Sequence, residues 1–298
     1  MRVVIAGGTG LLGRALTAAL IQQGHQVVIL TRSTRTGSVP FVSWVPDGTA
    51  GEWAQAIDGA DAVVNLAGES IGAGRWTDAR RQGIRESRVL PTRSLVAAIR
   101  GASRRPAVFV SGSAQGYYGD RGDEILTEAS APGGDFLAGV CVDWEAEAQE
   151  ASRLARVVLL RTAVVLDRDD GALPLMVQPF RFLAGGPLGS GRQFVSWIHH
   201  EDWVGIAAQA VVDERFAGPA NVGSPNPVPN AEFAKAIGRA IGRPSWIRTP
   251  APALRAALGE MADGLLLSSQ RMTPARALDL GYRFRHPDPY AALAGILR

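Results

Sequence analysis

Apolar residues in the first half of the chain form short continuous runs, and stretches with helical periodicity separate most of them. The runs have the length of strands that are buried on both faces of a sheet. They lie at residues 2–6, 27–30, 41–45, 62–66, 107–111 and 156–160. Helical patterns lie at residues 11–23, 77–100 and 136–154. This alternation predicts an α/β fold with a doubly wound parallel sheet.

The pattern changes after residue 166. A polar turn at 167–171 and a stretch rich in Gly, Pro and Phe lead to a strand-like run at 194–198, followed by a helix that we expect to begin at Asp202. Prolines then cluster between residues 225 and 252, which is typical of loops. We therefore expect residues 1–169 to form the sheet domain, with 198–224 returning to it. Residues 170–197 and 225–298 would form a smaller C-terminal lobe.

Length and composition agree with a folded chain of this kind. The 298 residues are 46% hydrophobic and 20% charged, which excludes a disordered chain. Cys141 is the only cysteine, so no intrachain disulfide can form. No run of about 18 apolar residues exists, and the first residues lead directly into a strand, so we expect a cytoplasmic protein.

The net charge of +3 is modest, and Lys235 is the only lysine. The densest basic stretch, residues 75–105, is interrupted by Asp78 and Glu86. We interpret it as a solvated helix face with a few phosphate-facing arginines, and expect neither a nucleic-acid nor a membrane partner.

A glycine-rich turn follows the first predicted strand and opens the first helix. It reads Gly7-Gly8-Thr9-Gly10-Leu11-Leu12-Gly13. Glycines at these positions permit a tight turn, close approach of a pyrophosphate and close helix–sheet packing, while the helix amino terminus offers free N–H groups. The turn therefore predicts a dinucleotide site with contacts from Gly7, Thr9, Gly10, Leu11, Leu12 and Gly13.

The end of the second strand indicates which dinucleotide binds. An acidic residue there usually holds the ribose hydroxyl of NAD, whereas arginine pairs with the 2′-phosphate of NADP. The chain has Thr31-Arg32-Ser33 with no acid, so we expect NADP(H), held by Arg32 and Thr31. At the end of the fourth strand, Leu66, Ala67, Gly68 and Glu69 would form a wall of the cofactor site.

These motifs resemble those of the extended short-chain dehydrogenase/reductases, the superfamily of nucleotide-sugar epimerases and dehydratases. The resemblance covers almost the whole chain and is most specific for an atypical group of epimerase-family, NADP-dependent oxidoreductases. Motifs of that group match Gly68-Glu-Ser-Ile, Asp135-Phe-Leu and Ser269-Gln-Arg-Met-Thr-Pro274. The resemblance implies a Rossmann domain with a C-terminal substrate lobe, and further cofactor contacts from Arg88, Ser111 and Val165.

The catalytic residues of the superfamily are only partly present. Its serine matches Ser113, but its Tyr-x-x-x-Lys pair falls on Leu137 and Cys141. Forming a tyrosinate at pH 7 costs roughly 4 kcal/mol without a nearby cation. Tyr117 or Tyr118, which follow Ser113, would therefore act as a neutral donor to a substrate carbonyl if either has a catalytic role, and a purely structural role in the turn is equally open. Cys141 would pack in the interior.

The leading hypothesis is an NADP(H)-dependent oxidoreductase or epimerase-like enzyme. It would act on a small carbonyl or hydroxyl substrate through Ser113 and one of Tyr117 and Tyr118. The alternative is a non-catalytic NADP(H)-binding sensor or scaffold. His199 and His200 are adjacent and would point apart, so we expect no metal. A monomer and a homodimer both remain open.

Overall fold

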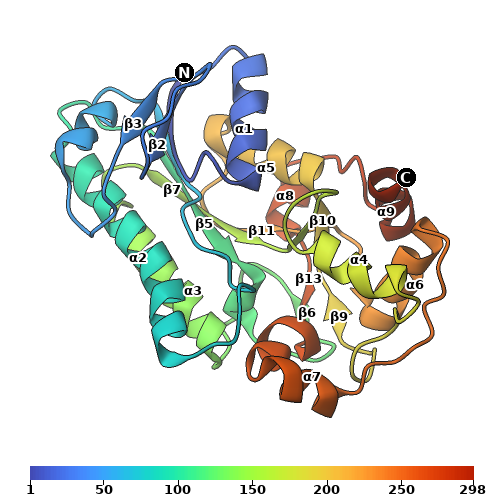
Figure 1. The fold of residues 1–298 in the computed structure, drawn as a ribbon. Coiled ribbons are helices and arrows are strands. Elements are labelled where there is room, and N and C mark those ends of the chain that lie inside the picture. Colours follow the sequence, from blue (N-terminus) through green and yellow to red (C-terminus); the bar gives the residue numbers. More distant parts are fainter.

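The computed structural model describes residues 1–298 and has a seven-stranded parallel sheet at its centre (Figure 1). The strand order is β11-β7-β5-β4-β1-β2-β3, and every neighbouring pair is parallel. The strands are β1 (Arg2–Ala6), β2 (Gln26–Thr31), β3 (Phe41–Ser43), β4 (Ala62–Asn65), β5 (Val108–Ala114), β7 (Arg156–Thr162) and β11 (Gly218–Val222). The order reverses beside β1, which confirms the predicted doubly wound sheet.

Helices cover both faces of this sheet (Figure 1). Helices α1 (Leu11–Gln22) and α5 (His200–Val212) pack on one face, and α2 (Asp78–Gly101) and α3 (Phe136–Gln149) pack on the other. Alternate residues of a strand point to opposite faces, so Val3 and Ile5 join the first core while Val4 and Ala6 join the second. Burial on both faces explains why the strands are apolar without alternation.

Several predicted boundaries differ from the structure, and the strand expected at 194–198 is divided into Phe194–Val195 and Trp197–His199. Helix α3 ends at Gln149 rather than at residue 154, because the next residues form short turns. Helix α5 begins at His200 rather than at Asp202, because the His199 side chain accepts a hydrogen bond from the Glu201 backbone N–H and caps the helix. Strand β5 extends to Ala114 because β7 continues to pair with it.

The smaller elements lie mostly in the second half of the chain. They include β6 (Ile125–Leu126), β8 (Val164–Leu166), α4 (Leu173–Arg181), β9 (Phe194–Val195), β10 (Trp197–His199), β12 (Val228–Pro229), α6 (Asn230–Ala240), α7 (Ala251–Leu258), β13 (Arg271–Met272), α8 (Ala275–Asp279) and α9 (Pro289–Leu297). Single helical turns occur at η1 (Glu52–Ala56), η2 (Gln115–Tyr118) and η3 (Asp263–Leu267). Helices α4, α6 and α9 share a separate apolar core. We call residues 170–197 and 225–298 the C-terminal lobe, with boundaries that remain a prediction.

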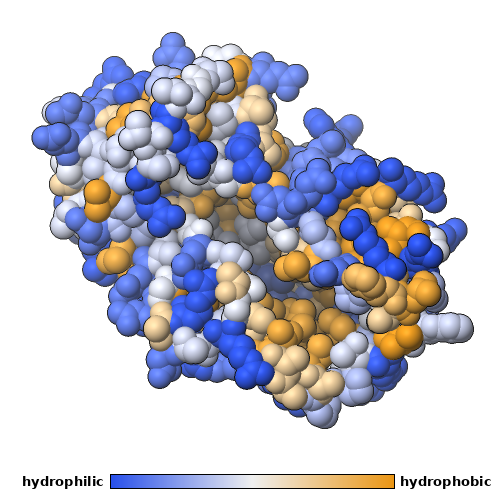
Figure 2. All heavy atoms as spheres, viewed as in Figure 1, coloured by the Kyte–Doolittle hydropathy of each residue, from blue (hydrophilic) through white to orange (hydrophobic).

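The surface is hollowed between the sheet domain and the C-terminal lobe (Figure 2). A groove of about 750 Å³ lies elsewhere, near the amino ends of β1 and β2, where Arg2, His25 and Gln26 line it. Ligands of open α/β sheets bind at the carboxyl ends of the strands, so we expect the ligand site in the central hollow and not in this groove. None of the helices combines the length and apolar character needed to cross a bilayer.

Candidate cofactor and substrate site

The glycine turn after β1 has the conformation that its sequence predicts. Gly7 has a φ of +77°, and a Cβ there would lie 2.5 Å from the Leu66 carbonyl group. A Cβ at Gly13 would lie 2.2 Å from the Gly7 carbonyl oxygen. Gly10 differs, because its Cβ would meet only that same oxygen, at 3.5 Å. Gly7 and Gly13 are therefore needed by the fold itself, whereas Gly10 leaves open space above the turn.

The amino end of α1 is ready to receive an anion. Gly10 occupies the cap position with no side-chain cap, and the first turn carries no acidic residue. The leading N–H groups of a helix lack intrahelical partners and carry partial positive charge. Leu11 and Leu12 thus lie where backbone N–H groups can meet a pyrophosphate, whereas Thr9 precedes the helix and its contact stays a prediction.

The end of β2 presents a free cation. Arg32 is exposed and makes no ion pair. Thr31 is buried, and its hydroxyl accepts a hydrogen bond from the Ser33 backbone N–H at 3.4 Å. Arg32 can therefore pair with a phosphate group without first giving up a carboxylate partner.

Buried Asn65 organises the loop after β4. Its side-chain amide donates to the Thr92 hydroxyl at 2.8 Å, and its oxygen accepts from the Ala67 N–H at 3.1 Å. These bonds hold the backbone of Leu66 and Ala67 against Gly7. Two segments expected to bind the cofactor therefore meet at the carboxyl edge of β1 and β4.

Arg88 contacts and supports the loop that follows β4. Its guanidinium donates to the Glu69 carbonyl at 3.0 Å and to the Ile84 carbonyl at 2.9 Å, and it lies over the Trp144 ring. Burial lowers the pKa of Arg88. A Cβ at Gly68 would lie 3.4 Å from the Arg88 Cζ, so the loop rests on this side chain. Arg88 thus positions Gly68 and Glu69, and a direct contact with the cofactor remains a prediction.

A buried polar network begins at Ser113, at the carboxyl end of β5. The Ser113 hydroxyl donates to the Glu145 carboxylate at 2.6 Å. Arg161, opposite Ser113 on β7, holds both carboxylate oxygens of Glu145, each at 2.8 Å. Burial opposes the charge of Arg161, but Glu145 outweighs that effect and raises the pKa of the guanidinium. Ser111, also predicted to contact the cofactor, is buried two residues earlier, and Val165 is half-buried on β8.

The two tyrosines after Ser113 have different environments. Tyr118 is fully buried, and its hydroxyl donates to Asn221 at 2.6 Å and accepts from Arg161 at 3.0 Å. Burial raises the pKa of Tyr118 to about 12. Tyr117 is half-buried, its ring lies 3.5 Å from the Arg161 Cζ, and its hydroxyl has no hydrogen-bond partner. Of the two, Tyr117 has the hydroxyl that is free to meet a substrate.

Helix α3 places apolar groups where the superfamily has its Tyr and Lys. Leu137 and Cys141 face the η2 turn, 3.3 Å and 3.8 Å from the position of a Cβ on Gly116. The Cys141 thiol is buried, and burial raises its pKa to about 12. Cys141 therefore packs as a neutral side chain, as its sequence context predicts.

The segment after Glu69 joins the two parts of the molecule. The Glu69 carboxylate pairs with Arg80 at 2.7 Å. Arg75 donates to the backbone carbonyls of Ala256 and Ala257 at the end of α7, and Trp76 packs on Phe136. The chain between β4 and α2 thus contacts α7 directly.

Sequence reasoning did not anticipate the role of Arg161 or the grouping of His199, Glu201 and His286. The available signal for Arg161 was a charged residue at the end of an apolar strand, which requires a buried partner.

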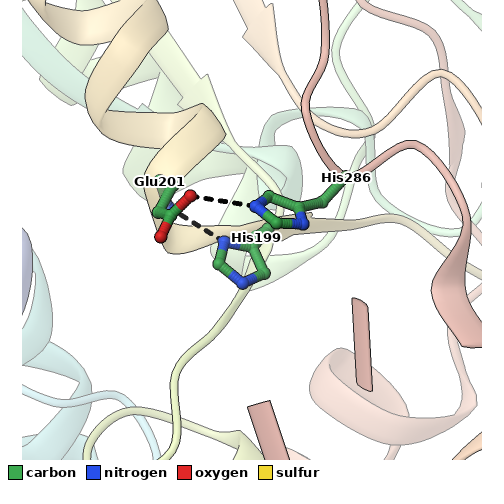
Figure 3. A group of neighbouring side chains, drawn as sticks. All are labelled: His199, Glu201 and His286. Carbon is green, nitrogen blue, oxygen red and sulfur yellow. Dashed lines mark hydrogen bonds and ion pairs between the residues drawn. The ribbon is translucent and has the colours of Figure 1, made fainter. Parts of the chain in front are cut away.

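Figure 3 shows the group formed by His199, Glu201 and His286, in which His286 Nε2 lies 2.9 Å from the Glu201 carboxylate. The imidazole rings of His199 and His286 are stacked, with centroids 3.7 Å apart and an angle of 21° between their planes. The ligand atoms of His199, Glu201 and His286 lie within 4.8 Å of one another, so the group could hold a metal ion. The rings of His199 and His200 also lie side by side, with centroids 4.6 Å apart, so the expectation that they point apart is wrong.

Comparisons with known proteins agree with this architecture. The model of the NAD dependent epimerase/dehydratase family matches residues 3–223, and a domain of unknown function, DUF1731, matches residues 249–296. Epimerase family protein YfhF of Bacillus subtilis is 40% identical over 302 residues, covering 100% of this chain and 98% of that protein. Epimerase family protein Mb2239 of Mycobacterium bovis is 43% identical over 286 residues, covering 95% and 93%.

A crystal structure of human epimerase family protein SDR39U1 (isoform 2) with NADPH is similar throughout. The TM-score is 0.91 at 35% identity, and 99% of each chain is covered. The family model, these relatives and the parallel sheet with its glycine turn lead to one assignment. The chain belongs to the NAD dependent epimerase/dehydratase family, within the extended short-chain dehydrogenase/reductases that its motifs resemble.

Proposed function

We propose that this chain is an NADP(H)-dependent oxidoreductase or epimerase-like enzyme that acts on a small carbonyl or hydroxyl substrate. The observation that carries the cofactor assignment is Arg32, an exposed cation without a carboxylate partner at the end of β2. The uncapped amino end of α1 supplies the complementary pyrophosphate site. The NADPH bound to the human relative supports the same choice. Bound NADP(H) would supply or accept the hydride.

The hydrogen bonds around Ser113 indicate whether the hydroxyls of Ser113 and Tyr117 can donate to a substrate or only accept from it. An ionised carboxylate only accepts hydrogen bonds, so the Ser113 proton is committed to Glu145. Ser113 can then accept a hydrogen bond from a substrate hydroxyl, but it cannot donate one to a carbonyl. Tyr117 remains as the donor to a substrate oxygen, because its hydroxyl is unpartnered. This modifies the shared carbonyl-polarising role expected from the sequence.

The experiment is a screen of NADPH oxidation with aldehydes, ketones and quinones. We expect turnover with at least one class, and a loss of roughly tenfold to a thousandfold in kcat for Tyr117→Phe, the scale of losing one polarising donor. Cys141→Ala is the control and should leave kcat unchanged. Loss of activity in Cys141→Ala with full activity in Tyr117→Phe would reverse these roles. Tight NADPH binding without turnover in any class would favour a non-catalytic sensor or scaffold.

A further inference from the structure

Five large apolar side chains of the C-terminal lobe extend into solvent. On α4 and the loop that follows it, Leu175 is 65% exposed, Phe182 76% and Leu183 51%. On the loop before α7, Trp246 is 78% exposed and Ile247 46%. We call these five residues the apolar patch. Figure 2 shows apolar surface gathered on this lobe, while the sheet domain is mainly polar.

Backbone hydrogen bonds join the two segments that carry the patch. The Ile247 N–H donates to the Gly185 carbonyl at 3.2 Å, and the Thr249 N–H donates to the Pro187 carbonyl at 2.9 Å. A Cβ on Gly186 would lie 2.3 Å from the Ile247 carbonyl oxygen, so the backbones are in direct contact. Leu175 lies seven positions before Phe182, the residue that follows the last turn of α4. The two segments that carry the five exposed side chains therefore lie next to each other.

Leu183 has an unusual backbone. Its φ of +59° is the only positive value at a non-glycine residue in the chain. A bulky residue is uncommon in this region, where glycine would be unstrained. This strained position nevertheless carries an exposed leucine, whose side chain does not pack in the apolar core of the lobe. Such local strain is more common at functional surfaces than elsewhere.

Unpaired arginines lie on the same two segments as the patch. Arg181, Arg192, Arg243 and Arg248 are exposed, and none makes an ion pair, although other surface arginines, such as Arg85 and Arg93, pair with acids. The segments 171–200 and 233–259, which carry the patch and these arginines, contain no Asp or Glu. The surface is therefore both apolar and cationic.

We propose that this surface docks on an anionic lipid bilayer. Trp246, Phe182 and Leu183 would enter the boundary between the headgroups and the acyl chains, where apolar side chains leave water. The arginines would contact the anionic headgroups. This contact is peripheral and departs from the expectation of no membrane partner. A second copy of the chain is a poorer occupant, because a two-fold contact would oppose the same unpaired arginines.

Co-sedimentation with vesicles tests the proposal. We expect the full chain to bind vesicles of phosphatidylcholine and phosphatidylglycerol in equal parts, to bind phosphatidylcholine alone much more weakly, and to dissociate in high salt. Trp246→Ser and Phe182→Ser should each weaken binding about tenfold. The pair Arg243→Glu with Arg248→Glu should weaken it by at least roughly fivefold per charge.

Matched controls separate the patch from general surface effects. Val45, which is 65% exposed, and Arg105, which is exposed on the sheet domain, lie outside the patch. Val45→Ser and Arg105→Glu should bind vesicles like the wild type. NADPH titration should be unchanged in every variant, which verifies the fold and keeps this test independent of the proposed enzyme function.

Two outcomes in the vesicle assay would overturn the proposal. The first is that the wild type does not bind the mixed vesicles. The second is that the patch variants and the control variants lose vesicle binding equally. A dimer in light scattering that Trp246→Ser dissociates would instead assign the patch to self-association. Binding of an oligothymidylate that Trp246→Ser abolishes, without vesicle binding, would assign it to single-stranded nucleic acid.

Discussion

Replacing Gly10 with alanine should weaken NADPH binding while leaving the stability of the fold almost unchanged. Gly10 has a φ of −77°, which alanine adopts without strain, and its Cβ would meet only the Gly7 carbonyl oxygen at 3.5 Å. That distance is an ordinary van der Waals contact. We therefore expect Gly10→Ala to change the free energy of unfolding by about 1 kcal/mol or less.

The same methyl group should weaken NADPH binding strongly. It would occupy the space above the turn through which the pyrophosphate approaches the N–H groups of α1. Displacing the phosphate from one or two charge-assisted hydrogen bonds, each worth about 1.5–3 kcal/mol, corresponds to a Kd raised by at least roughly tenfold. Titration of NADPH fluorescence, paired with thermal unfolding without cofactor, measures both effects.

Gly13→Ala is the matched comparison because it adds the same methyl group one helical turn away. Its Cβ would lie 2.2 Å from the Gly7 oxygen and 2.6 Å from the Gly8 Cα, both backbone atoms that cannot rotate aside. We expect destabilisation of about 2–4 kcal/mol. A Gly10→Ala variant that binds NADPH like the wild type would show that the pyrophosphate lies elsewhere. A Gly13→Ala variant of unchanged stability would contradict the close packing of the turn.

Three further predictions concern charge, burial and pH. Arg32→Ala should remove a preference for NADPH over NADH of about tenfold or more in calorimetric titrations, and equal wild-type affinities for the two would contradict the assignment. Tyr118→Phe should lower the free energy of unfolding by about 1–3 kcal/mol because buried partners lose their hydrogen bond, whereas Tyr117→Phe should leave denaturant midpoints unchanged; equal effects would contradict the difference in burial. Burial, followed by the charges of its histidine neighbours, lowers the pKa of His199 to about 4. The stabilisation from neutral His199 is therefore present above its unfolded pKa of about 6.5 and lost as pH falls toward 4. His199→Gln should flatten this part of the stability–pH curve and His25→Gln should not.

The sequence alone determined the sheet and predicted the residues of the cofactor half of the site. Continuous apolar strands require cover on both faces, and helical patterns between most of them supply it. Gly7 and Gly13 could be placed because strand, turn and helix are local and consecutive. Arg32 follows its strand directly, so its position required no knowledge of distant contacts.

Only the tertiary structure decided the substrate half. Ser113, Glu145, Arg161 and Asn221 come from four separate elements, and their hydrogen bonds depend on the register of β5 with β7 and on the rotation of α3. Tyr117 and Tyr118 are neighbours in the chain, yet one faces the Arg161 guanidinium from a half-exposed position and the other is fully buried. Local patterns cannot distinguish them, because burial is set by long-range packing. The same holds for His286, which reaches His199 across 87 positions in the sequence only through the folded chain.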